Sequence, residues 1–168
     1  MDPVIKNMVR VGIISSVNPD TCTARVAFKD KAATVSYDLP ILVRGSFQVK
    51  DYWLPDPGEQ VLCTFLPSGN AQGFILGSLY SKTDTPPVVD ANKRHISFPD
   101  GTTLEYDRAT HTLKVDATGP INIITVQDVT ITADNVLSIT APKGITISAT
   151  DRDGAGVQIN GRLTSESW

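Results

Sequence analysis

Hydrophobic residues in the first 80 positions fall into short runs that are separated by turn residues. The separating segments are rich in proline, glycine, asparagine and aspartate, which favour turns. No window shows the 3.6-residue apolar period of a helix. The pattern therefore predicts five strands, Val9–Val17, Thr23–Phe28, Leu39–Val43, Val61–Leu66 and Phe74–Tyr80. We expect them to form a small closed, OB-fold-like barrel over residues 1–80, with an SH3-like barrel as the alternative.

A polar segment follows and ends in two hairpins. Residues 81–95 lack an apolar pattern and include Pro86 and Pro87, so they predict a stiff linker. Beyond it, Ile96–Phe98 and Thr102–Tyr106 flank the turn signal Pro-Asp-Gly. Residues 107–111 then predict a second turn, which leads into a strand at 112–115. The domain boundary is accordingly placed in the linker.

From residue 113 onward the chain becomes periodic. An apolar pair with one residue between its members recurs every eight residues, five times without slippage. Such a pair lies on one face of a strand, whereas in a helix its members would be about 200° apart. The five pairs are Leu113 and Val115, Ile121 and Ile123, Val129 and Ile131, Leu137 and Ile139, and Ile145 and Ile147.

This repeat is too short for one chain to wind around itself. A three-sided coil would need about 24 residues, so five repeats complete fewer than two coils. Three chains side by side, each supplying one side of every rung, could instead point all pairs at a common axis. We therefore predict an intertwined trimeric β-helix, or β-prism, over residues 96–150. Burial of ten aliphatic side chains would contribute about 15–30 kcal/mol per chain before the entropy of ordering is subtracted.

The eight-residue register fails after residue 147. Another apolar pair, Val157 and Ile159, arrives twelve residues after Ile145, so residues 151–168 predict a C-terminal cap or tip that is built differently. With this pair, the predicted trimer core comprises Leu113, Val115, Ile121, Ile123, Val129, Ile131, Leu137, Ile139, Ile145, Ile147, Val157 and Ile159.

Charge and composition narrow the class of protein. Fifteen Lys and Arg against eighteen Asp and Glu give a net charge of −3, which argues against a protein that mainly binds nucleic acid. The sequence has no apolar stretch long enough for a spanning helix and no pattern typical of a secretory signal, so we expect synthesis in the cytoplasm. Cys22 and Cys63 are then expected in apolar strands as buried free thiols rather than as a disulfide or a zinc site.

Candidate chemical sites are weak. His95 and His111 have no motif around them and are interpreted as ordinary histidines. Asp151 and Asp153 resemble the start of a calcium loop but lack its later acidic ligand, so we expect a solvated turn. Trp168 is assigned to closing the trimer end, with binding in a partner's pocket as the alternative. No catalytic constellation is found, and we predict a protein without enzymatic activity.

Several of these segments together resemble a known family. They are Val11–Ile14 with Thr23–Val26, the stretch WLPDPGEQVL at 53–62, GFILGSLY at 73–80, and the hairpin entry from Phe98 to Asp107. They look like the baseplate assembly protein V family, the central spikes of contractile phage tails, which are similar to the spike proteins of type VI secretion systems. The resemblance covers most of the chain.

The resemblance implies an N-terminal OB-fold and a trimeric β-helical spike. It also implies attachment beneath the tail tube and baseplate hub, transient contact with the target cell envelope during puncture, and a place in the virion. Some members bind iron at the tip through a C-terminal His-x-His pair. His95 and His111 precede the shaft and lie 16 residues apart, so no metal site or cofactor is carried over. The sequence leaves open whether an ion lies on the trimer axis. We expect a separate tip-capping protein.

We therefore interpret the chain as a homotrimeric structural spike. The first alternative is an OB-fold module that binds oligosaccharide or nucleic acid, which 7% aromatic residues and an acidic balance support poorly. The second is a spike with a fused cell-wall hydrolase, for which residues 80–113 leave no room.

Overall fold

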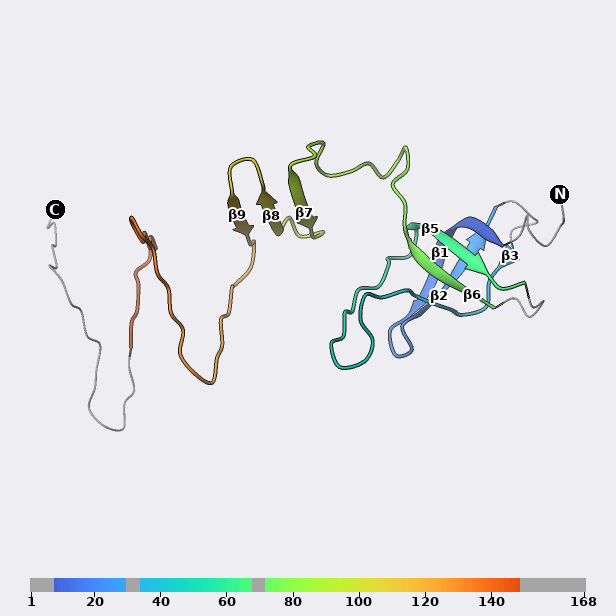
Figure 1. The fold of residues 1–168 in the computed structure, drawn as a ribbon, viewed down its shortest axis with the longest axis horizontal. Helices are drawn as coiled ribbons and strands as arrows, with labels where there is room; N and C mark the ends of the chain where they lie inside the picture. The colour runs from blue at the N-terminus through green and yellow to red at the C-terminus, as the bar shows by residue number, and fades with distance from the viewer. Residues whose placement is uncertain (1–7, 30–33, 68–71, 149–168) are drawn as a thin grey trace, which may run out of the picture. The chain divides into compact units, whose positions relative to one another are not determined.

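The computed structural model describes residues 8–29, 34–67 and 72–148. The chain divides into two units, 1–120 and 121–168. Within the described ranges the secondary structure is all β, as the sequence predicts, and no helix is present (Figure 1). Among these same residues, no helix has the length and apolar character needed to cross a membrane.

The first unit contains a sheet of six antiparallel strands. The order of hydrogen-bonded neighbours is β3-β2-β1-β5-β6, five strands that Figure 1 labels. Strand β4 also pairs with β2. The strands are β1 (Val9–Asn18), β2 (Thr23–Phe28), β3 (Thr34–Val35), β4 (Leu39–Pro40), β5 (Gln60–Phe65) and β6 (Gly73–Ser78). All five predicted strands are therefore present, and the two-residue β3 is an addition.

The hydrophobic core of this sheet comes from alternate positions of its strands. Its buried members are Ile14, Ala24, Val26, Phe28, Leu39, Val61, Cys63 and Ile75. Close packing also requires glycine at position 12, the one glycine of β1. A Cβ on Gly12 would lie 2.8 Å from the carbonyl oxygen of Ala27 on the neighbouring strand, which is closer than van der Waals contact allows. The first sheet thus buries alternate apolar residues of its strands within its own chain.

The strand ladders do not form the closed barrel that the sequence predicts. The predicted strand Leu39–Val43 is only two residues long, because Pro40 has no N–H to continue a ladder and the chain then leaves the sheet. An isolated bridge joins Ile41 to Ile75 of β6, where the Leu42 N–H donates to the Ile75 carbonyl at 2.8 Å. The segment after β4 therefore touches β6 at one point and forms no ladder with it.

A second, three-stranded antiparallel sheet follows. Its strands are β7 (Lys93–Ser97), β8 (Thr103–Asp107) and β9 (Thr112–Asp116), in the order β7-β8-β9. Both predicted hairpins are confirmed. Gly101 has a φ of 89° in the first turn, a left-handed conformation that favours glycine. Strand β7 begins inside the segment 81–95, where the sequence predicts a linker.

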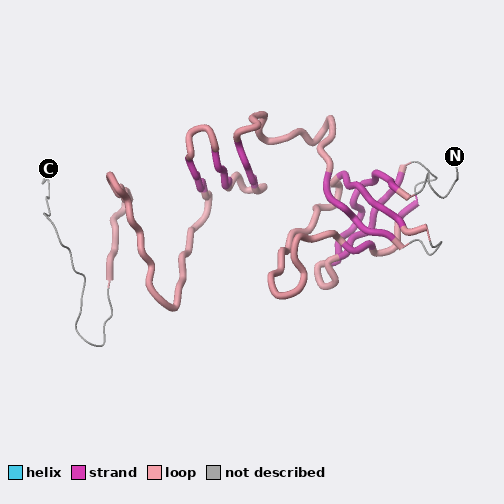
Figure 2. Tube along the Cα trace, viewed as in Figure 1, coloured by secondary structure: helices cyan, strands magenta, loops and turns pink. Residues whose placement is uncertain are grey.

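The described part of the second unit, residues 121–148, contains no strand (Figure 2). Within these described residues there is one backbone–backbone hydrogen bond, from the Gly144 N–H to the Ala141 carbonyl at 3.2 Å. A polypeptide normally pairs most of its backbone polar groups with protein or water. This segment, which carries four of the five periodic pairs, therefore has no ladder partner within the described chain.

Candidate assembly surface

The β7–β9 sheet has one polar and one apolar face, because successive side chains along a strand point to opposite sides. Cross-strand pairing places His95, Glu105 and Lys114 in one row, and Ile96, Leu104 and Val115 in the next. Tyr106 pairs with Leu113 in the following apolar row, with Arg94 at its β7 end. We call the side that carries Ile96, Leu104, Tyr106, Leu113 and Val115 the apolar face.

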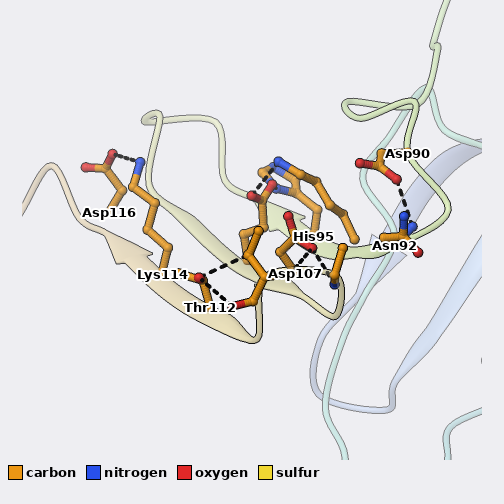
Figure 3. Close-up of polar contacts among 11 residues, drawn as sticks. Asp90, Asn92, His95, Asp107, Thr112, Lys114 and Asp116 are labelled. Atoms are coloured by element: carbon orange, nitrogen blue, oxygen red, sulfur yellow. Dashed lines mark hydrogen bonds and ion pairs between the residues drawn. The ribbon is translucent and has the colours of Figure 1, made fainter.

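Glu105 is the centre of the polar face. Its carboxylate accepts a hydrogen bond from Lys93 Nζ at 2.8 Å and contacts His95 Nδ1 at 2.9 Å (Figure 3). The Glu105 and His95 side chains are only 19% and 15% exposed. The Lys93 hydrogen bond, followed by the His95 contact, lowers the pKa of Glu105, and the same pairing raises the pKa of Lys93. The polar face is thus held together within one chain.

Two further carboxylates of this region, Asp100 and Asp107, stabilise turns. Asp107 accepts hydrogen bonds from the backbone N–H groups of Ala109 and Thr110 at 2.8 and 3.3 Å. Asp100 accepts from the Thr102 N–H at 2.9 Å and from the Thr118 hydroxyl at 3.0 Å. Backbone hydrogen bonds to the charged form lower the pKa of both carboxyl groups. Each carboxylate is therefore engaged in local structure.

In β7 and β8 the apolar face is the more exposed of the two, and in β9 both faces are exposed. The side chains of the apolar face range from 36% exposure at Ile96 to 67% at Leu113. Water-exposed apolar surface of this extent costs free energy and marks an interaction surface in soluble proteins. This arrangement reverses the usual one, in which the apolar side of a small sheet is the buried side. The described chain offers nothing that covers this face.

The periodic apolar residues continue this pattern into the second unit. Those described between residues 121 and 147 are 54–76% exposed, and the polar residues between them are exposed as well. A single chain therefore does not distinguish an inner from an outer side of the repeat. Ten of the twelve predicted core residues are described, and none is buried in the single chain, whereas Val157 and Ile159 lie outside the described residues.

Three residues of the apolar face, Ile96, Leu104 and Tyr106, are absent from the predicted core. They stand before the eight-residue period begins, so a search for that period passes over them. The signal that could have identified them is the pair spacing itself, because Ile96 and Phe98, like Leu104 and Tyr106, are two residues apart.

The remaining sequence candidates do not converge on a chemical site. His95 lies in β7, whereas His111 lies in the β8–β9 turn with a φ of 56°. No group of three or more His, Cys, Asp or Glu that could hold a metal occurs among the described residues. Residues 151–154 and Trp168 lie outside the described residues.

Both cysteines are free, as predicted. Burial raises the pKa of the Cys63 thiol to about 11. Cys22, expected in a strand, lies instead in the β1–β2 turn, where it is half-buried.

Comparison with known proteins supports a structural relationship. No protein-family profile matches the chain. The chain is 29% identical over 138 residues to the Spike protein of Escherichia phage P2, an alignment that covers 82% of this chain. The chain spans about 60% of the length of that relative. The similarity confirms the predicted relationship to phage spike proteins.

Proposed function

We propose that this protein is the central spike of a contractile phage tail, in which three copies form one needle. The observation that carries the proposal is the apolar face of β7–β9 and its periodic continuation, which a single chain leaves uncovered. The similarity to a phage spike protein supports the same role. The protein then acts as a structural component of the virion baseplate rather than as an enzyme.

Identical copies are the partners that best fit residues 121–148. A partner has to supply backbone hydrogen bonds and apolar side chains at an eight-residue period. Another copy of the chain carries that period by construction, and a three-fold axis lets every copy supply and receive the same contacts. Residues 96–150 form the β-helical shaft in this proposal, and residues 151–168 form its tip.

The apolar face extends the shared core toward the N-terminus. Ile96, Leu104 and Tyr106 join Leu113 and Val115 in facing the three-fold axis, while the row that contains His95 and Glu105 faces water. This orientation places the satisfied polar groups outside and the uncovered apolar groups inside, as the cost of burying unpaired polar groups requires.

The first 80 residues form the attachment domain in this proposal. The bridge between Ile41 and Ile75 is the point at which the open sheet would close into an OB-fold-like barrel. This domain, connected to the shaft by residues 81–95, binds the tail tube and the baseplate hub. A separate protein caps the tip, and the needle contacts the target cell envelope when it punctures it.

Mass measurement tests the proposal most directly. We expect light scattering of the purified full chain to give three times the chain mass, and SDS at room temperature to leave the trimer intact because unfolding is slow. Electron microscopy of the same sample should show a thin needle. A stably folded monomer would contradict the proposal.

A more specific form of this mass measurement uses matched variants on the two faces of β8. Leu104→Asp introduces a carboxylate on the apolar face and should prevent trimer formation. Thr103→Asp, one residue earlier on the polar side, should leave the mass unchanged. If both variants remain trimeric, the apolar face is not part of the shared core.

A further inference from the structure

An aromatic pair connects the long loop before β5 to the end of β7. The ring centroids of Trp53 and Phe98 are 6.0 Å apart with planes tilted by 48°, which is within the range of favourable aromatic contacts. The loop belongs to the first sheet, and Phe98 begins the turn of the second. The contact therefore joins the two sheets of the first unit.

The turn that follows Trp53 is hydrogen-bonded to the first sheet. Pro55, two residues later, is buried. Beyond it, the Gly58 N–H donates to the Ile14 carbonyl of β1 at 2.8 Å, and the Ile14 N–H donates to the Glu59 carbonyl at 2.9 Å. The Asp56 N–H also donates to the Glu59 carboxylate at 2.9 Å. The turn that follows Trp53 is therefore fixed to the first sheet.

Phe98 is continuous with the apolar face. It follows Ile96 by two residues, so the alternation of the strand places both on the same side. Its backbone is fixed by the hairpin turn, because the Phe98 N–H donates to the Thr102 carbonyl at 2.9 Å and the Gly101 N–H donates to the Phe98 carbonyl at 3.0 Å. Phe98 is thus held by its own backbone hydrogen bonds, and Trp53 shortly precedes a turn that is hydrogen-bonded to the first sheet.

The pair nevertheless remains largely open to water. Trp53 is 60% and Phe98 is 42% exposed. Rigid, exposed aromatic side chains lose little entropy on binding and contribute a large contact area, which makes them typical anchors of protein interfaces. The pair stands at the end of a face that already lacks a cover.

We propose that the Trp53–Phe98 pairs of neighbouring copies pack against one another and close the attachment-domain end of the shared core. This inference rests on the trimer proposed above. The occupant is a second copy because the exposed pair is continuous with the apolar face, which itself leads into the repeat that identical copies match. Trp53 then couples each attachment domain to the shaft and transmits axial load between them.

Tryptophan fluorescence of the full chain tests this assignment. The sequence has two tryptophans, Trp53 and Trp168, so the variant Trp168→Phe leaves Trp53 as the sole reporter. In trimers verified by light scattering, we expect a blue-shifted emission and an acrylamide quenching constant several-fold lower than in the denatured chain. If Trp168→Phe fails to assemble, the difference between the wild type and Trp53→Phe provides the same signal.

A reporter elsewhere in the same loop serves as the control. Phe47 is 82% exposed, and adding Phe47→Trp to Trp53→Phe and Trp168→Phe moves the fluorophore away from the pair. We expect this reporter to be quenched almost as strongly in the trimer as in the denatured chain. A difference between the two positions assigns the protection to Trp53 rather than to the loop as a whole.

The outcomes separate this inference from the proposed function. A trimer in which Trp53 is quenched as freely as the Phe47→Trp reporter overturns the inference and leaves the spike proposal standing. A folded monomer overturns both. A trimer with a protected Trp53, in which Trp53→Ala lowers the melting temperature and Phe47→Ala does not, supports the inference.

Discussion

The two sheets of the first unit use the same alternation of apolar and polar residues with opposite results. In β2 and β5 the alternate residues Ala24, Val26, Val61 and Cys63 are buried within the chain. In β8 the alternate apolar residues stay exposed and the polar side is the better covered one, and in β9 both sides are exposed. Alternation therefore shows that a strand has a side to bury, but not which molecule buries it.

The difference lies in the elements available to cover each sheet. The first sheet has six strands, and its core is covered by elements of the same sequence. The second sheet has three strands and is followed in the sequence by residues 121–148, which form no ladder in the described chain. A narrow sheet without a covering layer cannot bury a core by itself. Substitutions in both sheets and in the repeat test whether other copies provide that layer.

The largest effect is expected in the repeat. Ile131→Asp would place three carboxylates on the axis of the proposed trimer, and the cost of burying each unpaired charge is several kcal/mol. We expect this variant to be monomeric by light scattering. Thr130→Asp adds the same charge one residue earlier, on the proposed outer side, and should remain trimeric. Equal behaviour of the two variants would refute the assignment of inner and outer sides.

A core substitution in the first sheet should have the converse effect. Phe28 is buried and packs edge-on against Phe65 at 5.8 Å, with the guanidinium of Arg10 over its ring at 3.8 Å. Phe28→Ala should lower the free energy of unfolding of this domain by about 3–5 kcal/mol, measured by urea denaturation. The trimer mass should stay unchanged, because the shaft buries a different set of residues.

The exposed Val35 of β3 offers a matched control for that experiment. Val35 is more than half exposed, so Val35→Ala removes little buried surface and the urea midpoint should barely move. If Phe28→Ala dissociated the trimer, the attachment domain and the shaft would have to be one cooperative unit, and the comparison between them would fail.

Much of the fold can be predicted from the sequence, because apolar runs and turn residues agree with the observed strands and hairpins. Strand Thr23–Phe28 has the predicted bounds, and both hairpins form where turn residues stand between apolar pairs. Strand β4 is shorter than predicted, because Pro40 ends the ladder. The apolar run alone predicts a longer strand. Barrel closure depends on contacts between segments far apart in the sequence, such as Ile41 with Ile75, which periodicity does not encode.

The residues of the candidate surface can be predicted from the sequence only in part. The repeat identifies Leu113 and Val115, whereas Leu104 and Tyr106 lie outside its period. The pairing of Glu105 with Lys93 and His95 depends on the register of β7 against β8, which the sequence does not determine. Whether the predicted core is buried depends on other copies of the chain, so it stays a prediction.

An acid titration examines the polar side of the second sheet. The pKa of Glu105 is lowered in the folded state, so its carboxylate stabilises the fold above its ordinary value of 4.5, and this stabilisation is lost as the pH falls through the lower folded value. Glu105→Gln should therefore lower the melting temperature at about pH 7, and the difference from the wild type should shrink at about pH 2. Circular dichroism measures both.

The Lys114–Asp116 pair provides the comparison for this titration. Its atoms are 2.9 Å apart, but both side chains are more than half exposed, and such surface pairs contribute little. Asp116→Asn should therefore change the melting temperature much less than Glu105→Gln at about pH 7. A larger effect of Asp116→Asn would contradict the central role given to Glu105.

The smallest expected effect concerns the two thiols, which report on burial without a change in stability. Burial raises the pKa of Cys63 to about 11, so only about one thiol in a thousand is ionised at about pH 8. Cys22 is half-buried in a turn. An aromatic disulfide reagent should label Cys22 first in the native protein, and Cys63 should follow only when the first sheet opens. The Cys22→Ser variant isolates the slow phase, which Phe28→Ala should accelerate. Rapid labelling of Cys63 in the native protein would mean that the first sheet does not bury its own alternate residues, and the contrast with the second sheet would disappear.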